Sequence, residues 1–125
     1  MEIYEEWLWK AQHDIEGAKV LFEHGNLKDL SVYHTQQCAE KALKGYLAYK
    51  EHLIEKTHNL NILIGICCEY DKLFSQLLSK TFFLNGFDVK FRYPGSDLEP
   101  TDAETETAIE YAHYILEFVK NQITQ

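Results

Sequence analysis

The residues that could do chemistry gather in one stretch of the chain, residues 33–47. Read at helical spacing, four polar residues fall at positions i, i+3, i+4 and i+7 and therefore share one face of a helix: Gln37, Glu40, Lys41 and Lys44. One amide, one carboxylate and two ammonium groups within two turns could donate hydrogen bonds to a phosphate or to a carboxylate of a partner protein. The same spacing also fits an ordinary solvated helix face, and both interpretations stay open at this point.

Gln36 lies on the packing face of the same stretch. The other members of that face are apolar: Val32, Ala39, Leu43 and Tyr46. A buried amide must find hydrogen-bond partners or leave polar atoms unsatisfied. We therefore expect Gln36 and Glu40 to be substantially buried and hydrogen-bonded. Three cations are candidate donors to Glu40: Lys44, Lys41 and Arg92.

Arg92 is the only arginine in the sequence, and it precedes Tyr93 in a segment rich in aromatic residues, 83–100. A guanidinium binds carboxylates and phosphates through two parallel hydrogen bonds, so a sole arginine in such a segment points to a specific partner. That partner could be a ligand, or an acid such as Glu40 to which the loop is pinned. For Arg92 to serve the same anion as Lys41 and Lys44, the segment must fold back over their helix.

Metal and nucleophile patterns are weak. Glu110 with His113, and Glu55 with His58, have the i, i+3 spacing of di-metal helical bundles, but Glu55 precedes the expected start of a helix. The three cysteines are odd in number and lack a C-x-x-C spacing: Cys38, Cys67 and Cys68. We assign no catalytic residue, no metal and no cofactor.

Hydrophobic periodicity predicts an all-helical chain. The predicted long helices cover residues 4–23, 29–50 and 101–123, and a shorter one starts near residue 58 behind Thr57 as its N-cap. Residues 73–82 continue at helical spacing after a polar break, so the third helix is either kinked or split in two. Residues 83–100 contain both prolines and read as a packed loop. The expected fold is an antiparallel four-helix up-and-down bundle, with five helices if the third is split.

Length, composition and net charge restrict the classes of function that the chain could have. A chain of 125 residues predicts one domain, 1–125, and its net charge of −8 argues against binding nucleic acid by general phosphate neutralisation. The three cysteines without a disulfide or zinc pattern fit a reducing cytoplasm best. Acidic residues at the N-terminus and the lack of a long apolar run predict no signal peptide and no membrane span. The 17 aromatic residues exceed what a small helical core can hold, so we expect a homodimer.

Three motifs together resemble the HEPN domain family (higher eukaryotes and prokaryotes nucleotide-binding). The first is the run Gln36–Lys44, the second is Thr57-His58-Asn59-Leu60, and the third is Arg92-Tyr93-Pro94. The resemblance implies a bundle of four or five helices, commonly a homodimer, paired with a minimal nucleotidyltransferase in a two-protein system of toxin–antitoxin type. The site residues that it implies form a surface for a nucleotide or a partner: Gln37, Glu40, Lys41, Lys44, His58, Arg92 and Tyr93.

The sequence departs from the family pattern at one point. Many HEPN toxins are ribonucleases whose activity rests on an arginine followed, after four to six residues, by a histidine. Here the residues four to seven positions after Arg92 are not histidine: Ser96, Asp97, Leu98 and Glu99.

Two hypotheses therefore remain. The first is a non-catalytic module that binds a small nucleotide or the nucleotidyltransferase partner, with local RNA contact through stacking on Tyr33 or Tyr93. The second is a metal-independent ribonuclease with an atypical set, in which His58 or His34 is the general base and Arg92 holds the phosphate.

Overall fold

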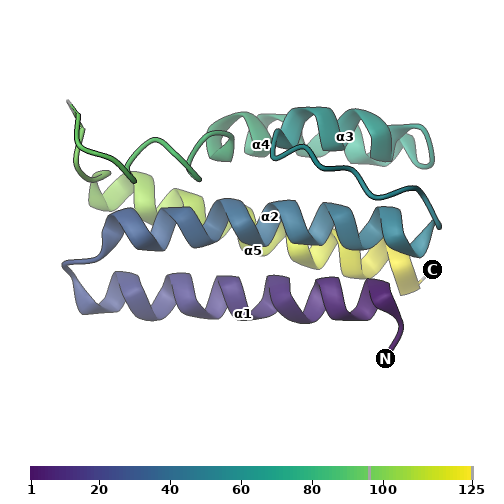
Figure 1. Cartoon of the computed structure of the whole chain (residues 1–125), viewed down its shortest axis with the longest axis horizontal. Helices are drawn as coiled ribbons and strands as arrows, with labels where there is room; N and C mark the ends of the chain where they lie inside the picture. Colours follow the sequence, from purple (N-terminus) through teal and green to yellow (C-terminus); the bar gives the residue numbers. More distant parts are fainter. Residues whose placement is uncertain (96, 125) are drawn as a thin grey trace.

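The computed structural model describes residues 1–95 and 97–124, which form helices and no strands (Figure 1). The helices are α1 (Ile3–His24), α2 (Lys28–Tyr49), α3 (Leu60–Cys68), the 3-10 helix η1 (Lys72–Leu77), α4 (Leu78–Leu84) and α5 (Asp102–Thr124). The all-helical prediction is confirmed, and the third helix of the predicted bundle is split into α3, η1 and α4. In the described residues, no helix combines the length and the hydropathy that a membrane crossing requires.

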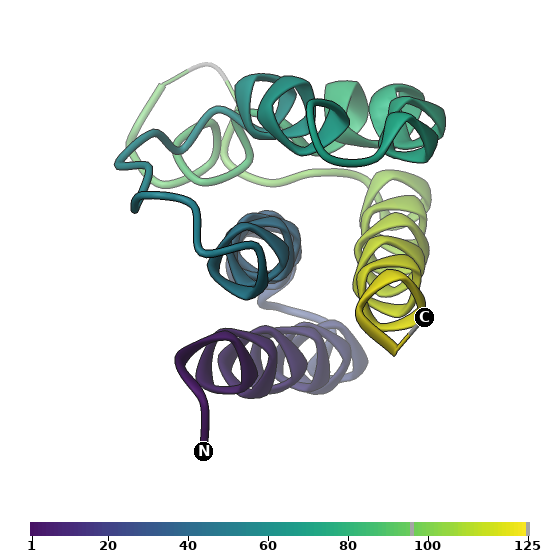
Figure 2. The same cartoon turned by 90° about the vertical axis from the view of Figure 1, so that its right-hand side faces the viewer.

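Helix α2 occupies the middle of the molecule. Helices α1 and α5 lie beside it, and α3 and α4 form a layer on the side away from α1 (Figures 1 and 2). The hairpin between α1 and α2 closes at Gly25, whose φ of 91° is left-handed and whose N–H donates to the carbonyl of Phe22. Residues 50–59 then run back along α2 as an extended strap before α3 begins.

Gly45 allows α1 and α2 to approach closely. A Cβ placed on Gly45 would lie 3.2 Å from the Cβ of Trp7 and 3.1 Å from the Cδ2 of Leu8. This close packing fixes the position of the N-terminal half of α1 against α2.

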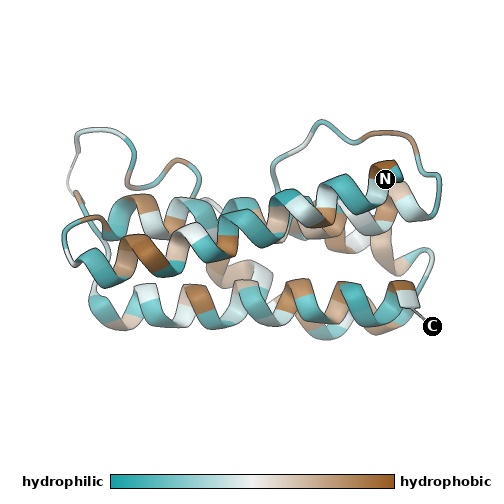
Figure 3. Cartoon of the chain, turned by 90° about the horizontal axis from the view of Figure 1, so that it is seen from below, coloured by the Kyte–Doolittle hydropathy of each residue, from teal (hydrophilic) through white to brown (hydrophobic). Residues whose placement is uncertain are grey.

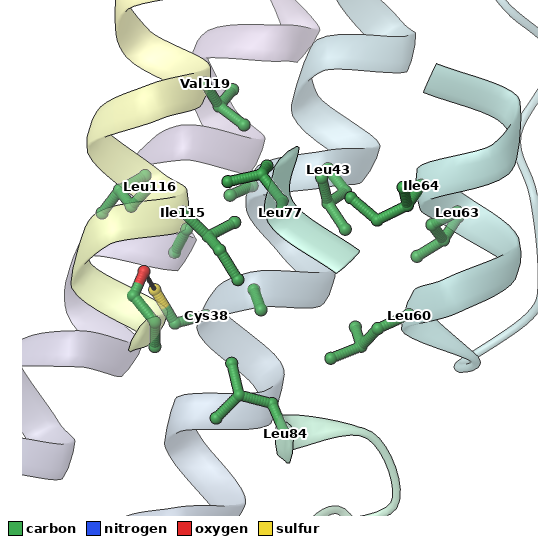
Figure 4. Packing of buried hydrophobic residues seen from close by; sticks show 14 of the residues in the cluster. Cys38, Leu43, Leu60, Leu63, Ile64, Leu77, Leu84, Ile115, Leu116 and Val119 are labelled. Carbon is green, nitrogen blue, oxygen red and sulfur yellow. Dashed lines mark hydrogen bonds between the residues drawn. The ribbon is translucent and has the colours of Figure 1, made fainter. Parts of the chain in front are cut away.

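The core lies between α2, α5 and the α3–α4 layer. Figure 4 shows Leu43 of α2, Leu63 of α3, Leu77 of η1 and Ile115 of α5 converging there, and all four are fully buried. The buried residues of each long helix recur at helical spacing, as the sequence pattern predicts.

Two helix starts differ from the prediction. Helix α2 begins at Lys28 after Leu27, so Asp29 is in the first turn and is not the cap. Helix α3 is capped by Asn59 and not by Thr57, because the Asn59 side chain accepts from the backbone N–H groups of Asn61 and Ile62 at 3.0 and 3.3 Å.

The start of α5 follows the prediction. Thr101 Oγ1 accepts from the N–H of Glu104 at 3.1 Å, and Glu104 Oε1 accepts from the N–H of Thr101 at 2.9 Å. The preceding loop is anchored by Phe87 and Phe91, which are buried.

Candidate functional site

Glu40 is the centre of a buried polar cluster on α2. Its side chain is almost fully buried, with 5% exposure, and accepts from Lys44 Nζ at 2.9 Å. His58 Nδ1, on the strap, lies 3.1 Å from each carboxylate oxygen, and Gln36 Nε2 donates to Oε1 at 3.3 Å. Burial of Gln36 and Glu40 with Lys44 as donor is thus confirmed. We call Gln36, Glu40, Lys44 and His58 the Glu40 cluster.

The Glu40 cluster holds a charged carboxylate. Burial raises the pKa of Glu40, but hydrogen bonds from Lys44 and His58 outweigh it, so the pKa lies below its ordinary value. The negative charge of Glu40 neutralises the ammonium group of Lys44 over a distance of 2.9 Å. His58 is different, because its side chain is 68% exposed while Glu40 fixes the orientation of its ring.

A second polar cluster joins α1 to α2. Asp14 is buried, with Oδ1 at 2.8 Å from His34 Nδ1 and Oδ2 at 2.7 Å from Lys41 Nζ. Burial raises the pKa of Asp14, but the hydrogen bonds from His34 and Lys41 lower it by more, so the carboxylate is charged. We call Asp14, His34 and Lys41 the Asp14 cluster. Asp14 was not identified from the sequence as a site residue. Its position beside the apolar stripe of Ala11, Ile15 and Ala18 could have indicated a buried carboxylate.

The two lysines of the predicted stripe are therefore each paired with a carboxylate of their own. Gln37, which lies between the two clusters on α2, is half-buried and donates from Nε2 to Gln36 Oε1 at 2.7 Å. The stripe is not a solvated face, because Lys44 is 9% exposed. Both of its ammonium groups are paired with carboxylates, Lys41 with Asp14 and Lys44 with Glu40.

Arg92 lies at the other end of the same face of α2. Its guanidinium carbon is 4.6 Å from the ring centroid of Tyr33, and no carboxylate of the described residues lies within 4.0 Å of it. The predicted alternative of a salt bridge to Glu40 is therefore wrong. Tyr33 precedes Lys41 by about two helical turns, which is about 12 Å along α2. Contrary to the expectation from the sequence, the loop therefore does not fold over Lys41 and Lys44. Tyr93, next to Arg92, is 66% exposed.

Neither the cysteines nor the two Glu–His pairs form a catalytic or metal site among the described residues. Burial raises the pKa of the Cys38 and Cys67 thiols, which disfavours the thiolate form that a nucleophile or a metal ligand needs. Glu55 contacts His52 at 3.0 Å and not His58. In the part of the chain that the structure describes, no three histidine, cysteine or acidic side chains form a group that could hold a metal ion. Ser96, four positions after Arg92, lies outside the described residues.

Comparison with known proteins decides the family. The HEPN domain model matches residues 4–122 of the chain. The chain belongs to the HEPN family. The resemblance predicted from its three motifs is thereby confirmed.

A known protein and two solved structures resemble this HEPN chain over most of its length. A protein of Methanocaldococcus jannaschii, MJ1304, whose name describes it as a candidate toxin, is 30% identical over 90% of this chain and 82% of its own length. The crystal structure of ST0689, an archaeal HEPN homologue, has a TM-score of 0.76 at 28% identity and covers 96% of this chain and 97% of that one. The crystal structure of TT1696 from Thermus thermophilus has a TM-score of 0.85 at 24% identity, covers 97% of this chain and 98% of that one, and shares the fold.

Proposed function

We propose that this HEPN protein is the binding component of a two-protein system of toxin–antitoxin type, and that Arg92 contacts an acidic group of a minimal nucleotidyltransferase partner. The toxin-named relative from M. jannaschii supports the toxin–antitoxin setting. The nucleotidyltransferase partner is inferred from the family resemblance.

One observation carries the choice of a protein partner over a phosphate. Lys41 and Lys44 are neutralised by Asp14 and Glu40, at 2.7 and 2.9 Å, so the predicted cation stripe offers little positive potential. The Arg92 guanidinium lies over the Tyr33 ring, and no carboxylate of the described residues pairs with it. A guanidinium held over a ring can still offer its N–H groups to a carboxylate in a bidentate contact.

The test is binding to a minimal nucleotidyltransferase, the class of partner that the family resemblance implies, measured by calorimetry. Arg92→Ala should weaken the complex by a factor of ten or more, about 1.4 kcal/mol. Arg92→Lys should restore little affinity, because an ammonium group lacks the planar fork. Lys90→Ala is the control, since Lys90 is exposed on the same loop. Equal affinity of the Arg92→Ala and Lys90→Ala variants would contradict the proposal.

Titration with a panel of nucleotides distinguishes a nucleotide ligand from a protein partner. If a small nucleotide binds, Lys41→Ala, Lys44→Ala and Arg92→Ala should each be titrated with it. Loss of nucleotide affinity in both lysine variants, with Arg92→Ala unchanged, would favour a phosphate site on Lys41 and Lys44 over the partner surface at Arg92. Because Lys41 and Lys44 stabilise buried carboxylates, the melting temperature of each variant must be measured alongside.

A second candidate function rests on His58. An exposed imidazole held at Nδ1 by a buried carboxylate 3.1 Å away has the arrangement of a general base, with Nε2 available to a substrate. The corresponding activity is metal-independent RNA cleavage. His58→Ala should abolish cleavage of a single-stranded RNA in the presence of EDTA, and His34→Ala serves as the comparison variant. Absence of cleavage by the native protein would remove this candidate.

A further inference from the structure

The groove between α1 and α5 is a second surface, separate from the Arg92 face. Figure 3 views the molecule from the side on which these two helices lie next to each other. Two shallow hollows, wide open to solvent, lie along them, with volumes of about 350 and 220 Å³. The larger is lined by Leu8, Trp9, Gln12 and Lys120 among others, and the smaller by Phe22 and Ile109 with three charged residues. None of these residues belongs to the Glu40 cluster, the Asp14 cluster or the Arg92 loop.

A chain of polar contacts joins the two helices between the hollows. Gln12 Nε2 donates to Glu16 Oε1 at 3.2 Å, and Lys120 Nζ donates to Gln12 Oε1 at 3.0 Å. Lys120 also lies 3.9 Å from Glu117. The ammonium group of Lys120 is therefore shared between a carboxylate oxygen of Glu117 and the amide oxygen of Gln12. It contributes little free positive charge at the larger hollow.

The floor of the groove is apolar at both ends. Trp9 is 48% exposed, and the centroid of its ring lies 3.9 Å from that of His13, with the two rings tilted against each other. Phe22 and Ile109 are half-buried at the other end. A partly exposed tryptophan beside a hollow is the kind of residue that dominates binding energy in protein interfaces.

The borders of the groove are acidic. Three carboxylates line the hollows: Glu5 and Glu23 on α1 and Glu106 on α5. Two more, Glu16 and Glu117, contact the lining residues Gln12 and Lys120, and the cations here are Lys19 and Lys120. A second copy of this chain would bring carboxylates of the same sign together, which disfavours self-association here. A basic partner matches both the apolar floor and the acidic borders.

We propose that the groove between α1 and α5 binds a basic amphipathic helix of a partner protein, with its apolar face on Trp9 and Phe22 and its lysines or arginines against the acidic borders. The distance from Glu5 to Glu23 along α1 is about 27 Å, which corresponds to a partner helix of about 18 residues. The inference does not depend on the proposed function, because it uses no residue of the Arg92 surface.

The test uses an 18-residue helical peptide of leucine and lysine, with leucines at i, i+3, i+4 and i+7, titrated into the full chain by calorimetry. We expect saturable binding of one peptide per chain. Glu16→Lys combined with Glu117→Lys should weaken it at least tenfold, because both acids are exposed on the borders. Glu51→Lys combined with Glu69→Lys is the control, since it makes the same change in net charge on exposed residues elsewhere.

Trp9→Ala provides the second variant and should also weaken binding at least tenfold, with an unchanged melting temperature as the check on folding. Three results would overturn the proposal: equal affinity for a peptide in which glutamates replace the lysines, equal weakening by the control pair, or no binding. A chain dimer that Trp9→Ala dissociates would show that a second copy covers the groove, and would also overturn it.

Discussion

Gln36 uses all of its hydrogen-bonding groups inside the protein, although its side chain has no exposure to solvent. Its amide nitrogen donates to Glu40 and to the carbonyl of His58, at 3.3 and 3.1 Å, and its oxygen accepts from Gln37 at 2.7 Å. The amide therefore ties the strap that carries His58 to α2. Gln36, a polar residue on an otherwise apolar face of α2, thus links this helix to the strap that covers it.

At the residue scale we predict that Glu40→Ala lowers the free energy of unfolding by more than about 1 kcal/mol, because it leaves the buried ammonium of Lys44 without its carboxylate. Urea denaturation measures the change. Glu69→Ala is the matched control, since this glutamate is exposed and should change stability by no more than about 0.5 kcal/mol. Equal stabilities of the two variants would contradict a buried ion pair.

The same two carboxylates predict how stability depends on pH. The pKa values of Glu40 and Asp14 are lowered in the folded protein from ordinary values of 4.5 and 3.8. The unfolded chain therefore takes up protons first, so the stabilisation is present above pH 4.5 and is lost as the pH falls through the folded-state values.

The urea midpoint should accordingly fall between about pH 5 and about pH 3, and the fall should be smaller in Glu40→Gln and in Asp14→Asn. A variant whose midpoint falls as steeply as that of the native protein would show that the carboxylate in question does not carry the effect.

At the scale of elements, the contact between α1 and α2 depends on the missing side chain of Gly45. Gly45→Leu should destabilise the protein by about 1–3 kcal/mol, because the new side chain meets Trp7 Cβ, which cannot move without the backbone of α1. Gly65→Ala is the control in α3, where no atom lies within 4 Å of the added Cβ, and it should stabilise by about 0.5–1 kcal/mol. Thermal melts of both variants measure this difference, and a Gly45→Leu protein as stable as the native one would refute the steric account.

At the scale of the whole molecule, apolar residues remain exposed on the α3 and α4 layer. Phe82 is 69% and Ile62 is 52% exposed, and a hydrogen bond of 2.9 Å between Thr81 and Asn61 holds their two helices together. We propose that this layer contributes to the expected homodimer, because large apolar side chains remain exposed on two neighbouring helices.

Light scattering should then give twice the chain mass of 14.7 kDa. Phe82→Glu should shift the protein to the monomer, whereas Val20→Glu, at an exposed valine of α1, should not. A native protein that scatters as a monomer at micromolar concentration would remove the prediction.

The sequence by itself determined the helices and their buried faces. Periodicity identifies a face because neighbours three and four apart lie together on any helix, so spacing named Lys44 as one of three candidate donors to Glu40 without choosing between them. The family could be recognised for a similar reason, since its motifs are short runs that can be read without knowing how they pack.

Only the tertiary structure decided what covers each face. Asp14 and Lys41 are 27 positions apart, and Arg92 and Tyr33 are further apart still, so no local spacing relates them. Asp14 contacts Lys41 because Gly45 allows α1 to pack close to α2. Arg92 contacts Tyr33, and not the lysines, because Phe87 and Phe91 anchor its loop in the core. The charge on a helix face can be read from the sequence, but whether that charge is free depends on carboxylates supplied by other helices.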